Sequence, residues 1–414
     1  MAIVVQKYGG SSVADIGKLR LVADQVVRTK EQGYDVVVVV SAMGKTTDNL
    51  LALARDAALP PDQIVANGSA APEPAKRELD MLLSTGERVS MSLLSIAIQA
   101  RGQDAVSFTG SQSGLITNDR HFDARIIEVR PHRIEDELCR GRIVIVAGYQ
   151  GMSYKREITT LGRGGSDTTA VALAAALGAV RCEIYSDVDG VYSADPRVVP
   201  DAAHLPELDY ATMQEMAESG AKVLNAQAVE WARRNKIAIH ARRTGDALER
   251  GQGRETVVSE HADGDASRRA VVVQKSLALV SASRSGLAAL LRVAAETGLP
   301  LGDVAVSGQE TAIWAPLTNV PNWGEVRRAL AGARVDGFGL TEGFGMLSLV
   351  GVEVGTRADV ISRALSLLPS EPRFTFSHPL RISCVLEEAA LESAARAWHS
   401  ELGPGQSEPR RMIA

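Results

Sequence analysis

Cysteine and aromatic residues are both scarce in this chain of 414 residues. The three cysteines, Cys139, Cys182 and Cys384, lie far apart and form no Cys-x-x-Cys pair, so neither a disulfide framework nor a thiolate metal site is expected. Phenylalanine, tryptophan and tyrosine together make up only 4% of the residues. Alanine, valine and leucine are therefore expected to fill the hydrophobic cores.

Positive charge is not in excess, and histidine motifs are absent. The 45 Lys and Arg residues are outnumbered by 50 Asp and Glu residues, and the net charge of −5 argues against nucleic acid as a main partner. None of the seven histidines belongs to an HxH or HExxH pattern, so a histidine-held metal is not expected. No apolar run has membrane-spanning length and no signal-type segment opens the chain, so we expect a cytoplasmic protein without a membrane partner.

Strand and helix patterns alternate through the first 245 residues. Strands are expected at residues 2–7, 35–41, 105–108, 143–147, 182–185 and 237–241, and helices at 17–31, after 48, in two parts over 78–100, after 169, and at 210–219 and 222–234. Five consecutive valines at 36–40 are typical of a strand covered on both faces. The alternation predicts an α/β fold with an open, mainly parallel sheet, whose ligands bind beyond the carboxyl ends of the strands.

The second half of the chain shows a different pattern of polar and apolar residues. Residues 244–268 are polar and without periodicity, which indicates a domain boundary. Beyond them strand and helix patterns repeat weakly, as two copies of a β/α unit of roughly 65 residues. Residues 59–77 are rich in Pro, Ala and Gly and are expected to form a surface insertion.

The most informative stretch is residues 160–169, TLGRGGSDTT. Three glycines within four positions allow the backbone N–H groups to close around a phosphate, and the helix pattern that follows directs a helix N-terminus at it. Arg163 adds a guanidinium suited to a carboxylate or phosphate, and Asp167 falls in the first helical turn. The alternative is a glycine-rich turn in which Asp167 is an ordinary helix cap.

Other polar residues follow strands or adjoin helices. Lys7 precedes two glycines at the carboxyl end of a strand, where a solvated strand end is the alternative, and residues 186–197 place hydroxyl, carboxylate and guanidinium groups in a loop that is otherwise a pair of turns. Glu87 suits an ammonium group or a helix cap, and Thr47 a ligand or an N-cap. Lys222, on an expected helix, is solvated by default. Residues 44–46 (GKT) are not part of a P-loop, because a valine stands at position 39 where that motif needs glycine.

Together these motifs resemble the aspartate kinase (aspartokinase) branch of the amino-acid kinase family. Residues 7–12 (KYGGSS) resemble the family's opening K-[FY]-G-G-[TS]-S, and residues 84–88, 160–169, 183–197 and 220–224 match its later signatures in order. Residues 265–405 resemble the paired, ferredoxin-like ACT regulatory domains more loosely. The resemblance implies a catalytic domain at 1–245, a linker at 246–268, ACT-like units at 269–340 and 341–406, and a tail at 407–414.

The same resemblance implies a reaction and its residues. The γ-phosphoryl group of ATP would be transferred to the side-chain carboxylate of L-aspartate, with Mg²⁺ bound mostly by the nucleotide phosphates and by no assigned protein residue. The implied catalytic residues are Lys7 and Asp167. The implied aspartate-binding residues are Thr47, Glu87, Arg163 and Ser166, and the implied ATP-binding residues are Lys7, Tyr8, Gly9, Gly10, Ser186, Asp187, Tyr192, Arg197 and Lys222.

The chain departs from the pattern of the family just after residue 224 and again in the regulatory half. Residues 281–286 (SASRSG) replace its usual Asp-Lys/Arg-Pro-Gly loop, residues 302–307 lack its Gln-Asn ending, and residues 225–227 (NAQ) replace His-Pro-Arg. These departures predict altered or weak feedback by lysine or threonine, the amino acids whose biosynthesis the resemblance implies. A homodimer through the ACT-like units, or association with a regulatory subunit, is also implied. The alternatives are a kinase for another amino-acid carboxylate and an inactive regulatory homologue.

Overall fold

An eight-stranded sheet organises the N-terminal lobe of the computed structural model, which describes residues 1–59, 74–162, 164–245, 253–260, 269–308, 310–320 and 323–404. The strand order is β12-β14-β13-β9-β1-β2-β6-β3, and every neighbouring pair is parallel except β13 with β14. The strands are β1 Ile3–Tyr8, β2 Asp35–Val40, β3 Ala105–Phe108, β6 Ile143–Ala147, β9 Arg181–Ser186, β12 Glu207–Asp209, β13 Ile239–Arg243 and β14 Glu255–Ser259. The expected open, mainly parallel α/β sheet is confirmed.

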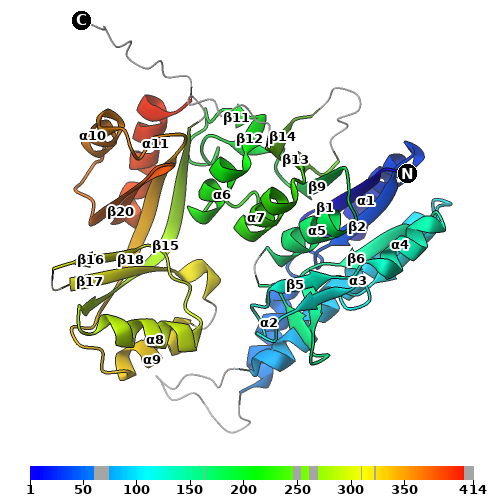
Figure 1. Ribbon diagram of the computed structural model, residues 1–414, viewed down its shortest axis with the longest axis horizontal. Helices are drawn as coiled ribbons and strands as arrows, with labels where there is room; N and C mark the ends of the chain where they lie inside the picture. The colour runs from blue at the N-terminus through cyan, green and yellow to red at the C-terminus, as the bar shows by residue number, and fades with distance from the viewer. Residues whose placement is uncertain are drawn as a thin grey trace, which may run out of the picture.

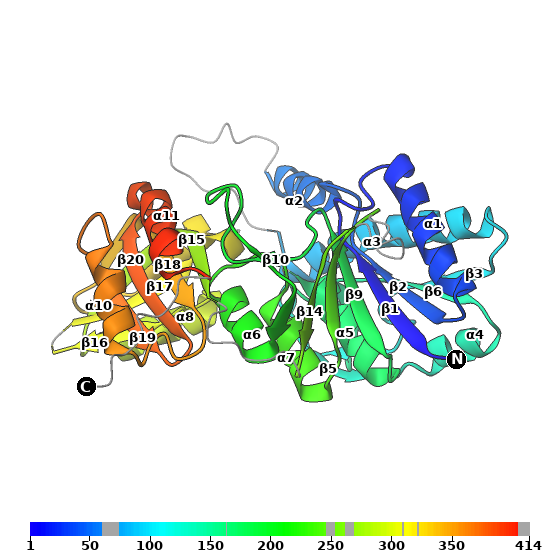
Figure 2. The same ribbon diagram turned by 90° about the horizontal axis from the view of Figure 1, so that it is seen from above.

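Helices cover both faces of this sheet, as the valine run predicts. All six residues of β2 are buried. On one face, α1 (Ile16–Glu31) and α3 (Lys76–Gln99) pack Leu19 and Leu94 into the same core as Val38. The opposite face is covered by α4 (His132–Cys139), α5 (Gly165–Ala176), α6 (Tyr210–Glu218) and α7 (Ala226–Asn235), as seen from above in Figure 2.

Two helical regions begin or end at residues other than those expected from the sequence. Residues 76–99 form the single helix α3 rather than two, because Gly86 allows the helix to pack closely on the loop after β2: a Cβ at Gly86 would lie 2.9 Å from the Cβ of Ala42. Helix α7 begins at Ala226, since the side chain of Asn225 caps it, and Lys222 therefore lies in a loop and not on a helix. Within the described ranges α3 is the one helix long and apolar enough to cross a membrane, and 50% of that window is buried.

Several short strands are absent from the sequence expectations. A second sheet has the order β5-β4-β7-β8, and β10 pairs with β11 in a hairpin. The bounds are β4 Leu115–Thr117, β5 Ile126–Val129, β7 Gln150–Ser153, β8 Ile158–Thr160, β10 Val191–Tyr192 and β11 His204–Leu205. Strands of two to four residues are too short to show alternation in a sequence. Helix α2 (Thr46–Ala57) follows β2 as expected, and residues 60–73 of the expected insertion lie outside the described ranges.

Strand β14 lies inside the stretch expected to be a linker. It pairs with β13 and β12, and its Val258 belongs to the same core as Val5 of β1. The N-terminal sheet therefore extends beyond residue 245. Residues 246–252 and 261–268 of that stretch, and the expected tail at 407–414, lie outside the described residues.

The C-terminal lobe is built on one antiparallel sheet of six strands in the order β16-β17-β15-β18-β20-β19. The elements are β15 Ala270–Ser283, α8 Leu287–Thr297, β16 Val304–Ser307, β17 Glu310–Pro316, a 3₁₀ turn Leu317–Asn319, α9 Trp323–Gly332, β18 Gly339–Val350, α10 Ala358–Ser366, β19 Phe374–His378, β20 Arg381–Glu387, a 3₁₀ turn Glu388–Ala390 and α11 Leu391–Leu402. Figure 1 shows the pair α8–α9 and the pair α10–α11 at opposite ends of the sheet. This arrangement is consistent with two ACT-like units, but they share β15: Val271 packs with α10 and α11, whereas Val280 packs with α8 and α9.

The loop that follows β9 attaches the N-terminal lobe to the C-terminal lobe. The Oγ atom of Ser193 lies 2.8 Å from Nε2 of His399 on α11 in a buried hydrogen bond, and the amide of Val271 donates to the carbonyl of Ser193 at 2.7 Å. A second contact is the ion pair between Arg381 and Glu215, at 3.1 Å. The C-terminal lobe thus contacts the loop in which the sequence places several nucleotide-binding residues.

Candidate functional site

An ion pair joins a lysine of the sheet to the first turn of a buried helix. Lys7 is the penultimate residue of β1, and its Nζ atom lies 2.7 Å from Oδ1 of Asp167. The two side chains are 12% and 10% exposed, so the pair is largely removed from water. The N-cap of α5 is Gly164, so Asp167 is not an ordinary cap, and Lys7 is not a solvated strand end.

Two glycines allow the backbone to approach closely around this pair. Gly164 has a φ of 73°, a left-handed conformation that glycine adopts without a steric penalty. At Gly10 a Cβ would lie only 2.9 Å from the carbonyl oxygen of Ala42, so the loop after β1 packs directly on the loop after β2. Together with the partial positive charge at the start of α5, these loops form an edge suited to an anionic ligand.

Glu87 is a buried carboxylate with one oxygen unused. It lies in the middle of α3 and is only 3% exposed, so it does not cap a helix. Its Oε1 accepts a hydrogen bond from the amide of Ala42 at 3.1 Å, whereas Oε2 has no hydrogen-bond partner among the described residues. Burial raises the pKa of Glu87 to about 7. Since buried polar groups are normally paired, the free oxygen is a candidate partner for a cationic group of a ligand.

Thr47 and Ser166 lie at the same end of the sheet. Thr47 is half-buried in the first turn of α2, whose N-cap is Lys45, so the N-cap alternative for Thr47 is wrong. Ser166 is buried, and its Oγ would lie 2.7 Å from a Cβ at Gly148, the residue that follows β6. The ends of β2 and β6 therefore meet the start of α5. Arg163 lies outside the described residues, so its place in this group stays a prediction.

The expected nucleotide residues begin one strand away from Lys7. Strand β9 pairs with β1, and the amide of Gly9 donates to the carbonyl of Tyr185 at 3.1 Å. The Oγ atom of Ser186 accepts a hydrogen bond from the amide of Val188 at 3.2 Å and so shapes the start of the loop. Asp187 is exposed beside it.

The remainder of this group is more open to solvent. Tyr192 donates its hydroxyl to Asp189 at 2.9 Å. Arg197 is 85% exposed and pairs with Asp195 at 2.8 Å. The hydrogen bond from Arg197, together with the charge of the exposed Lys222, lowers the pKa of Asp195, which places both cations near the same carboxylate. Arg197 of this loop and Lys222 of the segment before α7 therefore bring positive charge to the surface beside Asp195.

Tyr8 is expected to bind ATP, but its side chain is buried. Its ring is 0% exposed and stacks on Tyr185 with the ring centroids 4.8 Å apart. Its hydroxyl donates to Oε1 of Gln6 at 3.3 Å. The side chain thus packs in the core, and only the backbone of Tyr8 can face a ligand.

The sequence did not indicate that Asn225 lies against Gly164, the N-cap of α5. Its side chain occupies the space that a Cβ at Gly164 would need, while its Oδ1 accepts from the amide of Gln227 at 2.9 Å and caps α7. An asparagine immediately before a helix pattern is a known N-cap signal, which could have located the start of α7. Its contact with Gly164 depends on the packing of α5 on α7 and leaves no local signal.

The fold and this site define an α/β protein with an edge suited to anionic ligands, where parallel strands meet a helix N-terminus. Comparison with known proteins identifies the group. The chain belongs to the amino acid kinase family, whose sequence model matches residues 2–242. The resemblance inferred from the motifs is confirmed.

Individual relatives show how far the likeness extends. The aspartokinase of Mycolicibacterium smegmatis is 56% identical over 243 residues, which cover 58% of this chain and 55% of that protein, so this match spans about half the length of the relative. The aspartokinase of Geobacillus stearothermophilus is 38% identical over 422 residues, covering 97% of this chain and 98% of that protein. The crystal structure of E. coli aspartokinase III with aspartate and ADP is similar with a TM-score of 0.83 at 26% identity, covering 97% of this chain and 99% of that chain.

Replacing Glu87 by glutamine tests the burial of its carboxyl group. Because the pKa of Glu87 is raised from 4.5 to about 7, the protonated side chain favours the folded state, and this stabilisation is lost as the pH rises across that interval. Relative to wild type, the free energy of unfolding of Glu87→Gln should therefore rise with pH, by at most about 3 kcal/mol. Urea denaturation at several pH values measures this difference.

The exposed Glu78, on the same helix, provides the matched control variant Glu78→Gln. We expect its stability to follow that of the wild type across the same pH range. If the Glu87→Gln and wild-type curves also run parallel, the carboxyl group of Glu87 is not held in an environment that resists ionisation.

Proposed function

We propose that this protein is an aspartate kinase, which transfers the γ-phosphoryl group of ATP to the side-chain carboxylate of L-aspartate. A carboxylate oxygen forms a bond to the γ-phosphorus, the bond from that phosphorus to the bridging oxygen breaks, and ADP and 4-phospho-L-aspartate leave. The substrate carboxylate is ionised at neutral pH, so no general base is required. The protein has to bring one anion to another, and the observation that carries the proposal is the Lys7–Asp167 pair at the N-terminus of α5.

Lys7 would stabilise the charge on the phosphoryl group during transfer. Its ammonium group is held at 2.7 Å from Asp167, so its position is set before the nucleotide arrives. Asp167 orients the lysine or the metal–phosphate unit. Gly9 and Gly10 would let the backbone approach the phosphates, and Gly9 leaves open the space beside the lysine, where a Cβ would lie 3.5 Å from its Nζ atom.

L-Aspartate would be held between the loop after β2 and the start of α5. The unpaired Oε2 of Glu87 suits the α-ammonium group of the substrate. Thr47 and Ser166 supply hydroxyl groups at the same edge. Arg163 is proposed for a carboxylate of aspartate, on the resemblance alone.

ATP would lie toward the loop after β9. Ser186, Asp187, Tyr192, Arg197 and Lys222 are proposed to hold it, and the exposed cations Arg197 and Lys222 support this assignment. Mg²⁺ would arrive with the nucleotide, since phosphate oxygens supply the hard ligands that this ion prefers. Its charge would reduce the repulsion between the phosphates and the aspartate carboxylate.

The proposal includes an assembly and a location. Strand β16 is an edge of the C-terminal sheet, and its Val304 and Val306 are 45% and 53% exposed. An apolar edge strand readily pairs with another chain, which supports a homodimer through the ACT-like units, with a regulatory subunit as the alternative partner of this edge. We propose a cytoplasmic enzyme of the pathway to lysine and threonine.

Removing either member of the central ion pair tests the assignment of the catalytic residues. Lys7→Ala and Asp167→Ala should each lower kcat by roughly 100-fold or more, because a preorganised charge at the reacting group is lost. ADP release coupled to NADH oxidation, with L-aspartate and MgATP, measures the rate. Arg363→Ala, which removes a half-exposed arginine of α10 that pairs with Glu401, is the control and should retain full activity. A mild loss in folded Lys7→Ala protein would show that the role is misassigned.

The pKa of Glu87 predicts a pH dependence of substrate affinity. Near pH 6 the carboxyl group is mostly protonated in the free enzyme, since its pKa is about 7. The neutral group carries no charge that would attract the ammonium group of the substrate. The KM for L-aspartate should rise about tenfold from about pH 8 to pH 6, whereas the KM for ATP should change much less. Initial rates measured across this pH range, with each substrate varied in turn, give both KM values. A KM for L-aspartate that does not vary with pH would contradict the assignment of Glu87 to the ammonium group.

Weak feedback is the third part of the proposal. Ser283, the last residue of β15, and Ser285, in the loop that follows, both donate to Oδ2 of Asp336, at 2.7 and 2.6 Å. These hydrogen bonds lower the pKa of Asp336 and occupy the carboxylate with groups of the protein itself. Less of its hydrogen-bonding capacity remains for the ammonium group of an effector amino acid.

We therefore expect millimolar lysine plus threonine to change the rate at subsaturating L-aspartate by less than about twofold, which is under 0.5 kcal/mol of coupling. A lysine-inhibited aspartokinase assayed in parallel shows that the conditions reveal feedback. Strong inhibition of this protein by either amino acid would refute the prediction.

A further inference from the structure

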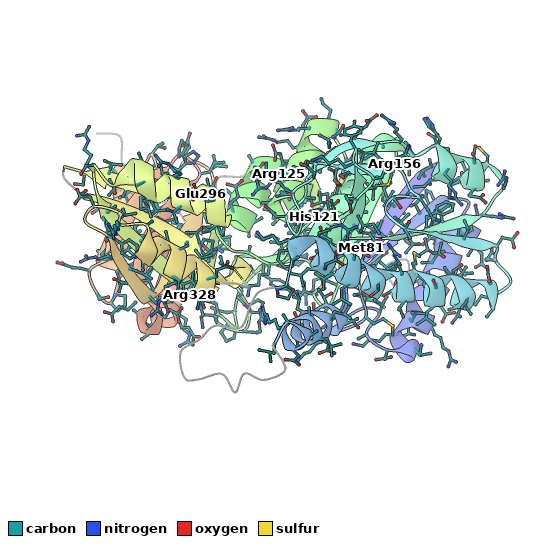
Figure 3. The ribbon with its side chains drawn as sticks, turned by 90° about the horizontal axis from the view of Figure 1, so that it is seen from below. Met81, His121, Arg125, Arg156, Glu296 and Arg328 are labelled. Carbon is teal, nitrogen blue, oxygen red and sulfur yellow. The ribbon has the colours of Figure 1, made fainter. Side chains whose placement is uncertain are left out.

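A fully buried carboxylate outside the residues discussed so far connects three parts of the N-terminal lobe. Asp80 lies on α3 and is 0% exposed. Its Oδ2 is 2.6 Å from Nδ1 of His121, its Oδ1 accepts from Oγ1 of Thr160 at 2.5 Å, and both oxygens lie within hydrogen-bonding distance of the amide of Phe122, at 3.0 and 3.2 Å. Figure 3 shows His121 beside the start of α3, next to Met81.

Each partner of Asp80 belongs to a different segment. His121 and Phe122 lie on the loop between β4 and β5, and Thr160 is the last residue of β8. The chain continues from Thr160 through Leu161 to Gly162, which precedes the N-cap of α5, Gly164, by two positions. The helix that carries Asp80 also carries Glu87, seven residues later and on the same face, because seven residues are close to two helical turns. One carboxylate thus links the helix of Glu87 to the turn that precedes Asp167.

The loop held by Asp80 contacts the glycine turn directly. The amide of Ala124 donates to the carbonyl of Thr160 at 2.9 Å. A Cβ at Gly162 would lie 3.3 Å from Oδ1 of Asp123, so no side chain separates the two segments. A shift of this loop would therefore be transmitted to the turn.

The backbone at Phe122 indicates that the loop is held under constraint. Phe122 has a φ of 71°, in the left-handed region that residues other than glycine seldom occupy because of a steric penalty. The hydrogen bonds from its amide to the carboxyl group of Asp80 offset this penalty. Without the carboxylate the loop should relax to an ordinary conformation.

We propose that Asp80 is a positioning residue for the amino-acid substrate. Its carboxylate sets the distance between Glu87 on α3 and Gly162 before α5, and with it the width of the edge proposed to receive L-aspartate. This inference rests on the proposed aspartate kinase function. It differs from a purely structural role in that it concerns the affinity for one of the two substrates.

Replacement of Asp80 by asparagine tests the proposal. Asparagine has the same shape but only one acceptor oxygen and no negative charge, so it cannot accept hydrogen bonds from His121, Phe122 and Thr160 together. The KM for L-aspartate should rise about tenfold in Asp80→Asn, equivalent to one lost charge-assisted hydrogen bond, while the KM for MgATP should stay within about twofold. Thr160→Ser, which keeps the hydroxyl, should behave as wild type, and Thr160→Val should follow Asp80→Asn. Steady-state kinetics with each substrate varied in turn provide these values.

Hydrogen–deuterium exchange in the same variants reports the position of the loop independently of turnover. In Asp80→Asn, amides of residues 118–124 should exchange faster than in the wild type. The control is Glu137→Gln, which alters a buried carboxylate of α4 that pairs with Arg140 and Arg142, away from this site. It should change neither the exchange of this loop nor the ratio of the two KM values.

The outcomes separate the two proposals. Faster exchange together with a selective rise in the KM for L-aspartate supports the positioning role. Unchanged exchange overturns it, and so does faster exchange with both KM values rising equally, which would reveal a structural residue. Absence of ADP formation by the wild-type protein with L-aspartate refutes the proposed function, while the exchange measurement still decides whether Asp80 holds the loop.

Discussion

The ion pair between Lys7 and Asp167 is the constraint on which the site depends. The two residues are 160 positions apart, yet their charged atoms lie 2.7 Å apart and are largely shielded from water. Such a pair tolerates little displacement, because either charge alone at this position would be poorly solvated. It therefore fixes the start of α5 against the end of β1. The glycines nearby serve other contacts: a Cβ at Gly10 would meet the carbonyl oxygen of Ala42, and a Cβ at Gly164 would meet the side chain of Asn225.

Helix α3 shows that burial of a carboxylate has opposite consequences when its partners differ. Asp80 is satisfied by a hydroxyl, an imidazole and an amide, and so it holds segments together. Burial raises the pKa of both carboxyl groups, but for Asp80 the hydrogen bonds from Thr160 and His121 act against that rise. Glu87, two turns later, has one oxygen without a partner among the described residues. The first carboxylate orders the structure, whereas the second is available to a ligand.

The two lobes meet at the loop after β9, which gives the C-terminal lobe a direct contact with the proposed nucleotide site. Ser193 is bonded both to His399 on α11 and to Val271 at the start of β15. Because β15 crosses both ACT-like units, a rearrangement in either unit would act on the same strand. This contact supplies a physical route by which binding in one lobe would alter affinity in the other.

The sequence alone determined the features that arise from local periodicity and local backbone chemistry. The five valines of β2 predict a doubly covered strand, and the glycines near Lys7 and Asp167 predict a backbone able to approach an anion. Only the tertiary structure decided which of these elements touch. The Lys7–Asp167 distance, the unpaired oxygen of Glu87, the burial of Tyr8 and the recruitment of residues 255–259 into the sheet all come from contacts between segments far apart in the chain. Local patterns encode which face of an element is buried, but not which neighbour covers it.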